Sequence, residues 1–183
     1  MKRHRYIIDD SSYPVFITTT ITKWIPVFTD VLIAEKSLRL LERLRAELDA
    51  RILAYVLMPH HLHAIVKTIQ KGHLSALMRK WKSLTARMIV GRSASLHENW
   101  LKVFKNSARE FKRQKVETYQ IWQPRFDDFA IRTEKQLMTK LNYIHCNPLK
   151  HHITEAAEDY PYSSFHDYCG GRNDFISIEL WNM

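Results

Sequence analysis

Two histidines stand two residues apart within a short apolar run. His61 and His63 flank Leu62 in the segment 55–66. Because successive side chains of a strand point to opposite faces, a strand here would place both imidazoles on one face and Leu62 on the other. Two imidazoles on one rigid strand provide half of a divalent-metal site. Taken alone, such a pair is more often a solvent-facing or core-edge feature, so a metal site needs further ligands.

A second group of polar side chains lies on a helix predicted over residues 133–148. Thr133 and Gln136 have the spacing of a capping box, and Pro148 marks the end of the helix. Its buried stripe would consist of Leu137, Leu141 and Ile144. A flanking face would carry Tyr143, Asn147, Gln136 and Lys140. The alternative interpretation is that the tyrosine packs at the edge of the core and Asn147 caps the helix end.

Both segments carry motifs of a known family. Met58-Pro59 precedes the histidine pair, and the run Tyr143-Ile-His-Cys-Asn147-Pro148 follows downstream. Together they resemble the HUH tyrosine transposases, in particular the REP-associated tyrosine transposases of bacteria. Similar stretches over residues 14–28, 121–132 and 159–165 extend the resemblance to nearly the whole chain. Two positions depart from the usual pattern: His60 replaces an Asn, and Phe129 replaces a His after Asp128.

The resemblance implies a set of catalytic roles. Tyr143 would be the nucleophile, and His61, His63 and Asn147 would bind the metal. Lys140 and Gln136 are candidates for catalytic support because helical spacing places them on the same face as Tyr143. Such a ligand set with open water positions suits Mg²⁺ or Mn²⁺. Attack of the tyrosine on a phosphodiester would give a 5′-phosphotyrosine link and a free 3′-OH. The implied protein is a metal-dependent endonuclease and strand transferase for single-stranded DNA at a hairpin, acting in DNA transposition.

The positive charge of the chain is concentrated in a basic helical region, residues 71–120. This region contains twelve Lys or Arg and three Glu, which accounts for the whole formal charge of +9. Such a stretch on an otherwise neutral domain is typical of proteins that bind a phosphate backbone. The candidate DNA-binding residues are Arg79, Lys80, Lys82, Arg87, Lys102, Lys105, Arg109, Lys112 and Arg113. Trp81 and Trp100 are better explained by core packing than by base stacking, whereas the aromatic tail over residues 159–183 fits either role.

Two other functions are compatible with the residues. The chain could bind structured nucleic acid without turnover, although it has every candidate catalytic residue. It could also be a general metal hydrolase that uses His61 and His63, but that function leaves the basic region unexplained. The sequence does not decide between a monomer and a homodimer, nor whether Tyr143 acts in its own chain.

The pattern of elements predicts one domain over residues 1–183. Strands are expected over 13–22, 51–57 and 61–68, with helices from Asp30 to about residue 50 and over 73–90. A turn is expected after Gly91, then a helix or mobile arm over 96–117 and an edge strand or extended connection over 121–131. This order is the ferredoxin-like βαββαβ plan: an α+β fold with an antiparallel sheet, helices on one face and the tyrosine helix appended.

The sequence also predicts a cellular location. Its two cysteines form no Cys-x-x-Cys pair, which favours a reducing compartment. No apolar run approaches the roughly 20 residues that cross a membrane, and the first residues do not form a signal peptide. We therefore expect a soluble, cytoplasmic protein without membrane partners.

Overall fold

A four-stranded antiparallel sheet forms the centre of the computed structural model, which describes residues 12–110, 119–171 and 174–180. The strands are β1 (Val15–Thr20), β2 (Ala50–Met58), β3 (His61–Thr68) and β4 (Asp127–Ala130). Their order is β2-β3-β1-β4, and each neighbouring pair is antiparallel. This is the sheet order of the ferredoxin-like plan, so the predicted fold class is confirmed.

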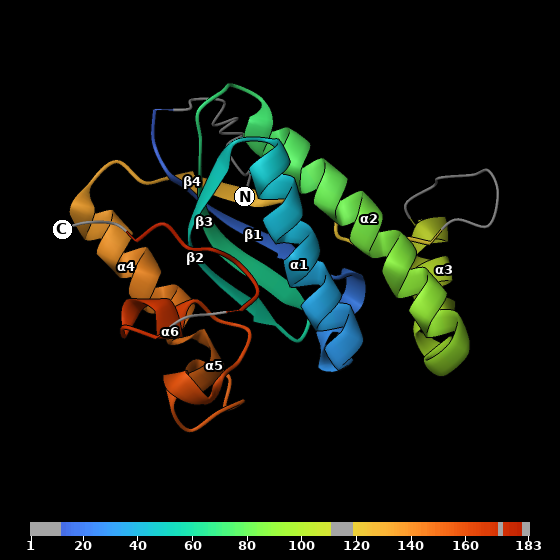
Figure 1. The fold of residues 1–183 in the computed structure, drawn as a ribbon. Coiled ribbons are helices and arrows are strands. Elements are labelled where there is room, and N and C mark those ends of the chain that lie inside the picture. Colours follow the sequence, from blue (N-terminus) through green and yellow to red (C-terminus); the bar gives the residue numbers. More distant parts are fainter. Residues whose placement is uncertain (1–11, 111–118, 172–173, 181–183) are drawn as a thin grey trace.

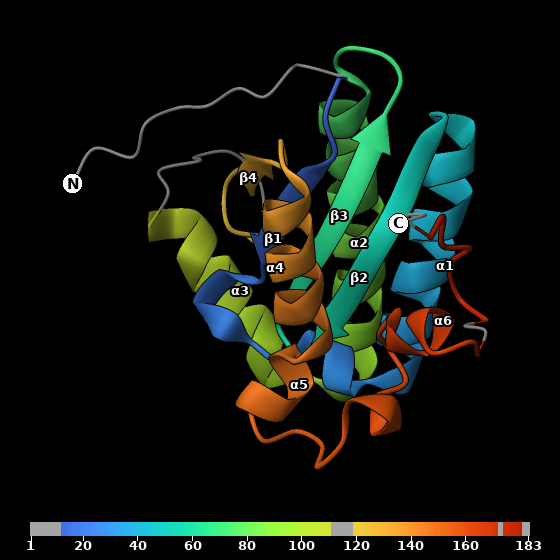
Figure 2. The ribbon, with the colours of Figure 1, turned by 90° about the vertical axis from the view of Figure 1, so that its left-hand side faces the viewer.

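Helices cover both faces of this sheet. The longer helices are α1 (Val31–Glu47), α2 (His73–Leu96), α3 (Glu98–Glu110) and α4 (Glu134–His145), and the short ones are α5 (Asn147–Lys150) and α6 (Phe165–Tyr168). Three 3₁₀ turns lie at Thr22–Trp24, Val27–Thr29 and Ala157–Asp159. Figures 1 and 2 show α1 and α2 on one face of the sheet and α4 on the other.

The alternation of side chains along β3 divides the core into two layers. Leu62, Ala64 and Val66 are buried with the apolar sides of α1 and α2. Ile65 points to the opposite face, where it is buried with the stripe of α4 that consists of Leu137, Leu141 and Ile144. The histidines alternate with Leu62 and Ala64, so β3 presents them to α4, as the sequence predicts.

Two predicted helix starts have the expected caps. The Asp30 carboxylate accepts hydrogen bonds from the backbone N–H groups of Leu32 and Ile33, at 3.0 and 3.3 Å, and caps α1. At the start of α4, Thr133 and Gln136 form the complete capping box. Both helices therefore begin where short-range sequence signals place them.

The prediction of a turn after Gly91 is wrong. Helix α2 continues through Gly91 to Leu96. A glycine inside a helix costs only about 1 kcal/mol relative to alanine. Buried side chains on both sides of it, Ile89 and Ser93, tie this part of α2 to the core and offset that cost.

The tyrosine helix ends earlier than its sequence suggests. Helix α4 stops at His145, Cys146 caps its end, and a separate short helix α5 begins at Asn147. Pro148 lies in the first turn of α5, where its missing N–H is not needed. Asn147 and Tyr143 thus belong to two consecutive helices rather than one.

The part of the aromatic tail that the structure describes packs along β2. The hydroxyl of Tyr160 donates to the Leu57 carbonyl at 2.6 Å, and that of Tyr168 donates to the Leu53 carbonyl at 2.8 Å. These contacts favour the packing role of the tail.

Trp81 is likewise a core residue, because its ring is fully buried and its indole N–H donates to the Ser37 carbonyl at 2.8 Å. No helix within the described residues is both long and apolar enough to span a membrane.

Candidate active site

The two histidines of β3 lie side by side beneath α4. Their ring centroids are 4.5 Å apart. His61 is 7% exposed and His63 is 5% exposed, so both imidazoles are largely withdrawn from solvent. Figure 2 shows α4 running across this face of the sheet.

His63 is held in place by two residues of β1. Its Nδ1 is hydrogen-bonded to the Thr18 hydroxyl at 2.8 Å, and Thr18 is its partner in the strand register. The ring of Phe16 stacks on the imidazole, with centroids 5.4 Å apart and an interplanar angle of 21°. Because Thr18 occupies Nδ1, Nε2 is the nitrogen available to a ligand or a proton donor.

Tyr143 reaches this available nitrogen from α4. Its hydroxyl oxygen lies 3.5 Å from His63 Nε2, and the two ring centroids are 5.1 Å apart. The edge of the half-buried phenol also contacts the ring of Phe16. The fold thus brings the predicted nucleophile to one of the predicted metal ligands of the same chain.

Asn147 completes the group from the start of α5. It is 1% exposed, and its side chain lies beside the imidazole of His61, whose pKa it acts to raise. Its amide oxygen, Oδ1, is buried with no hydrogen-bond partner among the described residues. An unsatisfied buried polar atom costs about 1–3 kcal/mol. A buried acceptor without a donor next to two imidazoles is what a cation ligand requires, so the residues present fit a divalent metal ion.

The fit of this site to a metal ion depends on the amide oxygen of Asn147. Within the described ranges, no three or more His, Cys, Asp or Glu side chains are grouped so that they could hold a metal ion. Two imidazoles and one amide oxygen leave the remaining coordination positions to water and substrate. Such an open set suits Mg²⁺ or Mn²⁺.

Burial keeps both histidines in the form that binds metals. It lowers the pKa of His61 to about 2, and the neighbouring imidazoles of His63, His60 and His151 act in the same direction. Burial likewise lowers the pKa of His63 to about 4, assisted by the positive charge of Lys140. Both rings are therefore neutral at pH 7, with a lone pair free for a cation.

The two candidates for catalytic support differ in position. The Lys140 ammonium lies 5.7 Å from the centroid of the Tyr143 ring and 4.3 Å from that of Phe16. The Gln136 amide oxygen instead accepts from the backbone N–H groups of Arg132 and Thr133, at 2.8 and 3.3 Å. The structure therefore brings Lys140 to the tyrosine and uses Gln136 in the helix cap.

Helix α2, which carries several of the predicted DNA-binding residues, lies on the opposite face of the sheet from α4 (Figures 1 and 2). Arg79 and Arg87 are exposed on α2, as is Arg109 on α3. Lys80 forms an ion pair with Glu47 at 3.7 Å, and Lys102 forms one with Glu98 at 3.5 Å. Lys105 is half-buried on α3, and Lys112 and Arg113 lie outside the described residues.

Lys82 makes contacts within the chain. Its ammonium donates to the Gln123 carbonyl at 2.8 Å and to the Arg125 carbonyl. Burial lowers its pKa to about 8. These contacts hold the segment before β4 against α2, which gives Lys82 a structural role.

Sequence reasoning missed three residues next to the site. Thr18 could have been found by aligning the alternating residues of β1 with those of β3. Lys150 and His151 follow Asn147 by three and four positions, which is the helical spacing for a shared face. The Lys150 ammonium lies 5.1 Å from the Tyr143 ring centroid, and the rings of His151 and His61 are 6.4 Å apart.

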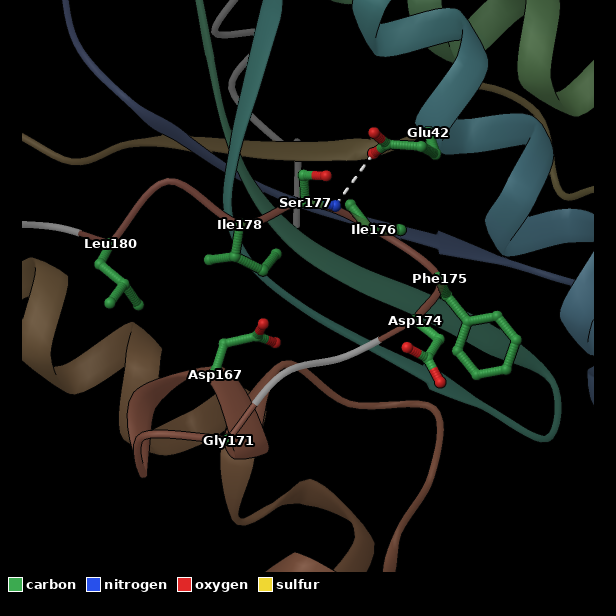
Figure 3. A pocket seen from close by; sticks show the side chains of 9 residues that line it. All are labelled: Glu42, Asp167, Gly171, Asp174, Phe175, Ile176, Ser177, Ile178 and Leu180. Atoms are coloured by element: carbon green, nitrogen blue, oxygen red, sulfur yellow. Dashed lines mark hydrogen bonds between the residues drawn. The ribbon is translucent and has the colours of Figure 1, made fainter.

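A pocket of about 610 Å³ lies elsewhere, between α1 and the C-terminal segment (Figure 3). It is lined by Glu42, Asp167, Gly171, Asp174, Phe175, Ile176, Ser177, Ile178 and Leu180. The Glu42 carboxylate accepts from the Ser177 N–H at 3.1 Å and from the Arg45 guanidinium. None of the predicted site residues lines this pocket, so it is distinct from the group around Tyr143.

The chain is similar to several known proteins. The family described as "Transposase IS200 like" matches residues 12–107, a stretch that contains His61 and His63 and ends before Tyr143. A Haemophilus influenzae protein described as a REP-associated tyrosine transposase is 32% identical over 115 residues, 62% of this chain and 57% of the relative. The REP-associated tyrosine transposase of Escherichia coli K12 is 35% identical over 89 residues, 42% of this chain and 54% of the relative. The chain thus spans little more than half the length of these curated relatives.

A solved structure extends the similarity of fold to the tyrosine helix. A REP-associated tyrosine transposase bound to a REP hairpin matches 100% of this chain and 94% of that chain, with a TM-score of 0.62 and 21% sequence identity. The family match covers more than half of the chain and includes both histidines. The chain therefore belongs to the IS200-like transposase family.

Proposed function

We propose that this protein is a metal-dependent endonuclease and strand transferase that acts on single-stranded DNA beside a hairpin. The observation that carries the proposal is the position of the Tyr143 hydroxyl, 3.5 Å from Nε2 of His63. Family membership and the similarity to REP-associated tyrosine transposases support it. In this reaction Tyr143 forms a covalent bond to the 5′ phosphate of the broken strand.

Three residues would hold the metal ion: His61 and His63 through ring nitrogens, and Asn147 through its unpartnered amide oxygen. When bound, Mg²⁺ or Mn²⁺ supplies a Lewis acid that polarises a non-bridging phosphate oxygen and stabilises the leaving 3′ oxygen. The neutral state of both imidazoles at pH 7 removes the need to displace protons when the ion binds.

Tyr143 carries out the substitution at phosphorus. A new bond forms between the Tyr143 oxygen and phosphorus, and the bond from phosphorus to the 3′ oxygen breaks. The phenol proton is lost to the surroundings, and the leaving 3′ oxygen takes up a proton. Lys140 places a positive charge beside the phenol, where negative charge develops as the proton leaves.

The covalent bond accounts for strand transfer as well as cleavage. A phosphotyrosine link is a phosphodiester, so it retains the bond that was broken in the DNA. The 3′-OH of another strand can therefore attack the link and release Tyr143 without ATP. Cleavage and joining are the forward and reverse directions of one reaction at one site.

The proposed nucleophile and metal ligands lie together within one chain. Tyr143 contacts His63 of its own chain, and Asn147 contacts His61 of the same chain. We therefore propose that the tyrosine acts in its own chain and that a monomer is sufficient for cleavage. The exposed arginines of α2 and α3 would bind backbone phosphates of the hairpin.

A covalent-adduct assay tests the proposed function. The protein is mixed with single-stranded oligonucleotides that contain a hairpin and an unpaired flank, with Mg²⁺ or with EDTA, and run on a denaturing gel. We expect an adduct in Mg²⁺ and none in EDTA. A protein that binds without turnover would shift the hairpin on a native gel but form no adduct. A hydrolase would cut the DNA without an adduct.

A further inference from the structure

We propose that Lys150 is a catalytic residue whose ammonium binds a non-bridging oxygen of the scissile phosphate, next to Lys140. This inference rests on the proposed function, because it assigns a residue to the same reaction. The sequence motifs point to Lys140 but not to Lys150, which comes from the next helix.

Two ammonium groups lie around the ring of Tyr143. The distances from the ring centroid are 5.1 Å for the Lys150 Nζ and 5.7 Å for the Lys140 Nζ. Lys150 is exposed and Lys140 is half-buried, so the side chain of Lys150 is the more accessible of the two to a ligand from solution. These distances place both charges at the residue that must approach the phosphate.

The break between α4 and α5 accounts for the position of Lys150. In a straight helix Lys150 would lie about 10 Å along the axis from Tyr143. Instead, α5 starts anew at Asn147, and residues three apart share one face of a helix. Asn147 directs its side chain to His61, and Lys150 extends back to Tyr143. One short helix therefore serves both the metal ligands and the nucleophile.

The charge of these two lysines is not neutralised by any carboxylate of the described residues. Within the residues that the structure describes, neither ammonium has a carboxylate oxygen within ion-pair distance. Lys80 and Lys102, by contrast, each pair with a glutamate. Two like charges at one site repel each other, and an anion between them relieves that repulsion. The anion that the proposed reaction brings to Tyr143 is a phosphodiester.

The role of Lys150 would be electrostatic. As the tyrosine oxygen attacks, negative charge increases on the non-bridging oxygens, and an ammonium already in place stabilises that charge more than it stabilises the ground state. Lys150 keeps its proton throughout, and no bond to it forms or breaks. Its loss should therefore lower the rate of the chemical step more than the affinity for DNA.

The experiment compares three variants of the full chain with the parent in single-turnover cleavage of a hairpin oligonucleotide. Lys150→Met removes the charge, Lys150→Arg keeps it, and Lys135→Met removes an exposed charge near the start of α4 as a matched control. At saturating protein we expect Lys150→Met to slow adduct formation on the order of a hundredfold. Its Kd for uncleaved hairpin should rise only a few-fold, as for one lost phosphate contact.

The other variants and the reverse reaction separate catalysis from structure. Lys150→Arg should recover most of the rate, and Lys135→Met should match the parent. Strand joining from the isolated adduct should slow by the same factor as cleavage in Lys150→Met, because both directions share a transition state. An unchanged rate in Lys150→Met would overturn the inference and leave the proposed function standing. The inference would also be overturned if Lys150→Met lost both rate and Tm and if Lys150→Arg did not restore the rate. If the parent itself forms no adduct, the proposed function fails and this role of Lys150 fails with it.

Discussion

The hydroxyl of Tyr143 and Nε2 of His63 are 3.5 Å apart although eighty residues separate them in the chain. The contact depends on two features of the fold: β3 turns its histidines away from α1 and α2, and α4 packs its apolar stripe on the face that receives them. The proposed nucleophile and the proposed metal ligands therefore meet through sheet and helix packing rather than through a flexible loop. Their geometry is set before any DNA arrives.

The proposed metal ligands should differ in importance. His61→Ala and His63→Ala should each abolish measurable Mn²⁺ binding, because each removes one of two nitrogen ligands. Asn147→Ala should be milder, since a water molecule can replace one oxygen ligand. Calorimetric titration with Mn²⁺ measures these affinities, and circular dichroism checks the fold. His60→Ala is the control for the strand register, because His60 precedes β3. If His60→Ala loses the metal and His61→Ala retains it, the ligand assignment is wrong by one residue.

Thr18 should affect metal binding without touching the metal. Its hydroxyl holds Nδ1 of His63 at 2.8 Å, and Thr18→Val removes that hydrogen bond at nearly constant volume. Loss of a hydrogen-bond partner behind a metal-binding histidine typically costs about 10- to 100-fold in affinity. We expect a loss of this size in Mn²⁺ titrations, with Thr18→Ser close to the parent. Equal affinities for Thr18→Val and the parent would show that Thr18 does not support His63.

Some features of the site could be predicted from sequence because they depend on local pattern. The bounds of β3, the shared face of its histidines and the capping box of α4 follow from alternation and spacing alone. The continuation of α2 past Gly91 could not be predicted, because it depends on the burial of Ile89 and Ser93 by distant parts of the chain. The hydrogen bonds from Lys82 to two backbone carbonyls could not be predicted either, because those carbonyls lie more than 40 residues away in the chain.

The exposed arginines of α2 should contribute to DNA affinity through phosphate contacts. Arg79→Gln combined with Arg87→Gln should weaken hairpin binding. Each lost phosphate contact should reduce the slope of log K against log salt by about one. Fluorescence anisotropy at several salt concentrations measures this slope. Arg43→Gln, an exposed arginine on α1 that pairs with Glu47, is the control. The same slope for the double variant and the parent would mean that this face of α2 does not contact DNA.

Asp30 should make the stability of the fold depend on pH in acid. Burial alone would raise its pKa, but hydrogen bonds from Arg92, the Ile33 N–H and His97, with the charge of Arg92, lower it overall. In the unfolded chain the pKa is about 3.9. Because the pKa of Asp30 is lower in the folded state, ionised Asp30 stabilises the fold above pH 4. This contribution is lost as the pH falls toward the folded-state pKa.

The variant Asp30→Asn isolates this charge, because asparagine caps a helix about as well as aspartate. It should lower the free energy of unfolding by about 1 kcal/mol or more at pH 7, since it weakens hydrogen bonds to a charged group. Below pH 4 the difference from the parent should shrink as the carboxyl of Asp30 becomes protonated in the folded state. Urea unfolding at several pH values measures the loss of unfolding free energy at pH 7 and its change with pH. Glu155→Gln, at an exposed position, is the control. A difference that stays constant down to pH 2 would show that the charge of Asp30 is not responsible.

The polarity of the covalent link tests the central claim most directly. A hairpin oligonucleotide labelled downstream of the cleavage site is incubated with protein and Mg²⁺, digested with protease and analysed by mass spectrometry. Because the 3′ oxygen leaves, the label should be attached to the peptide that contains Tyr143, and the upstream fragment should be released with an extendable 3′-OH. Tyr143→Phe should form no adduct while it still binds the hairpin, and Tyr13→Phe should behave like the parent. Label on any other residue, or attachment of the upstream fragment, would contradict the proposed role of Tyr143.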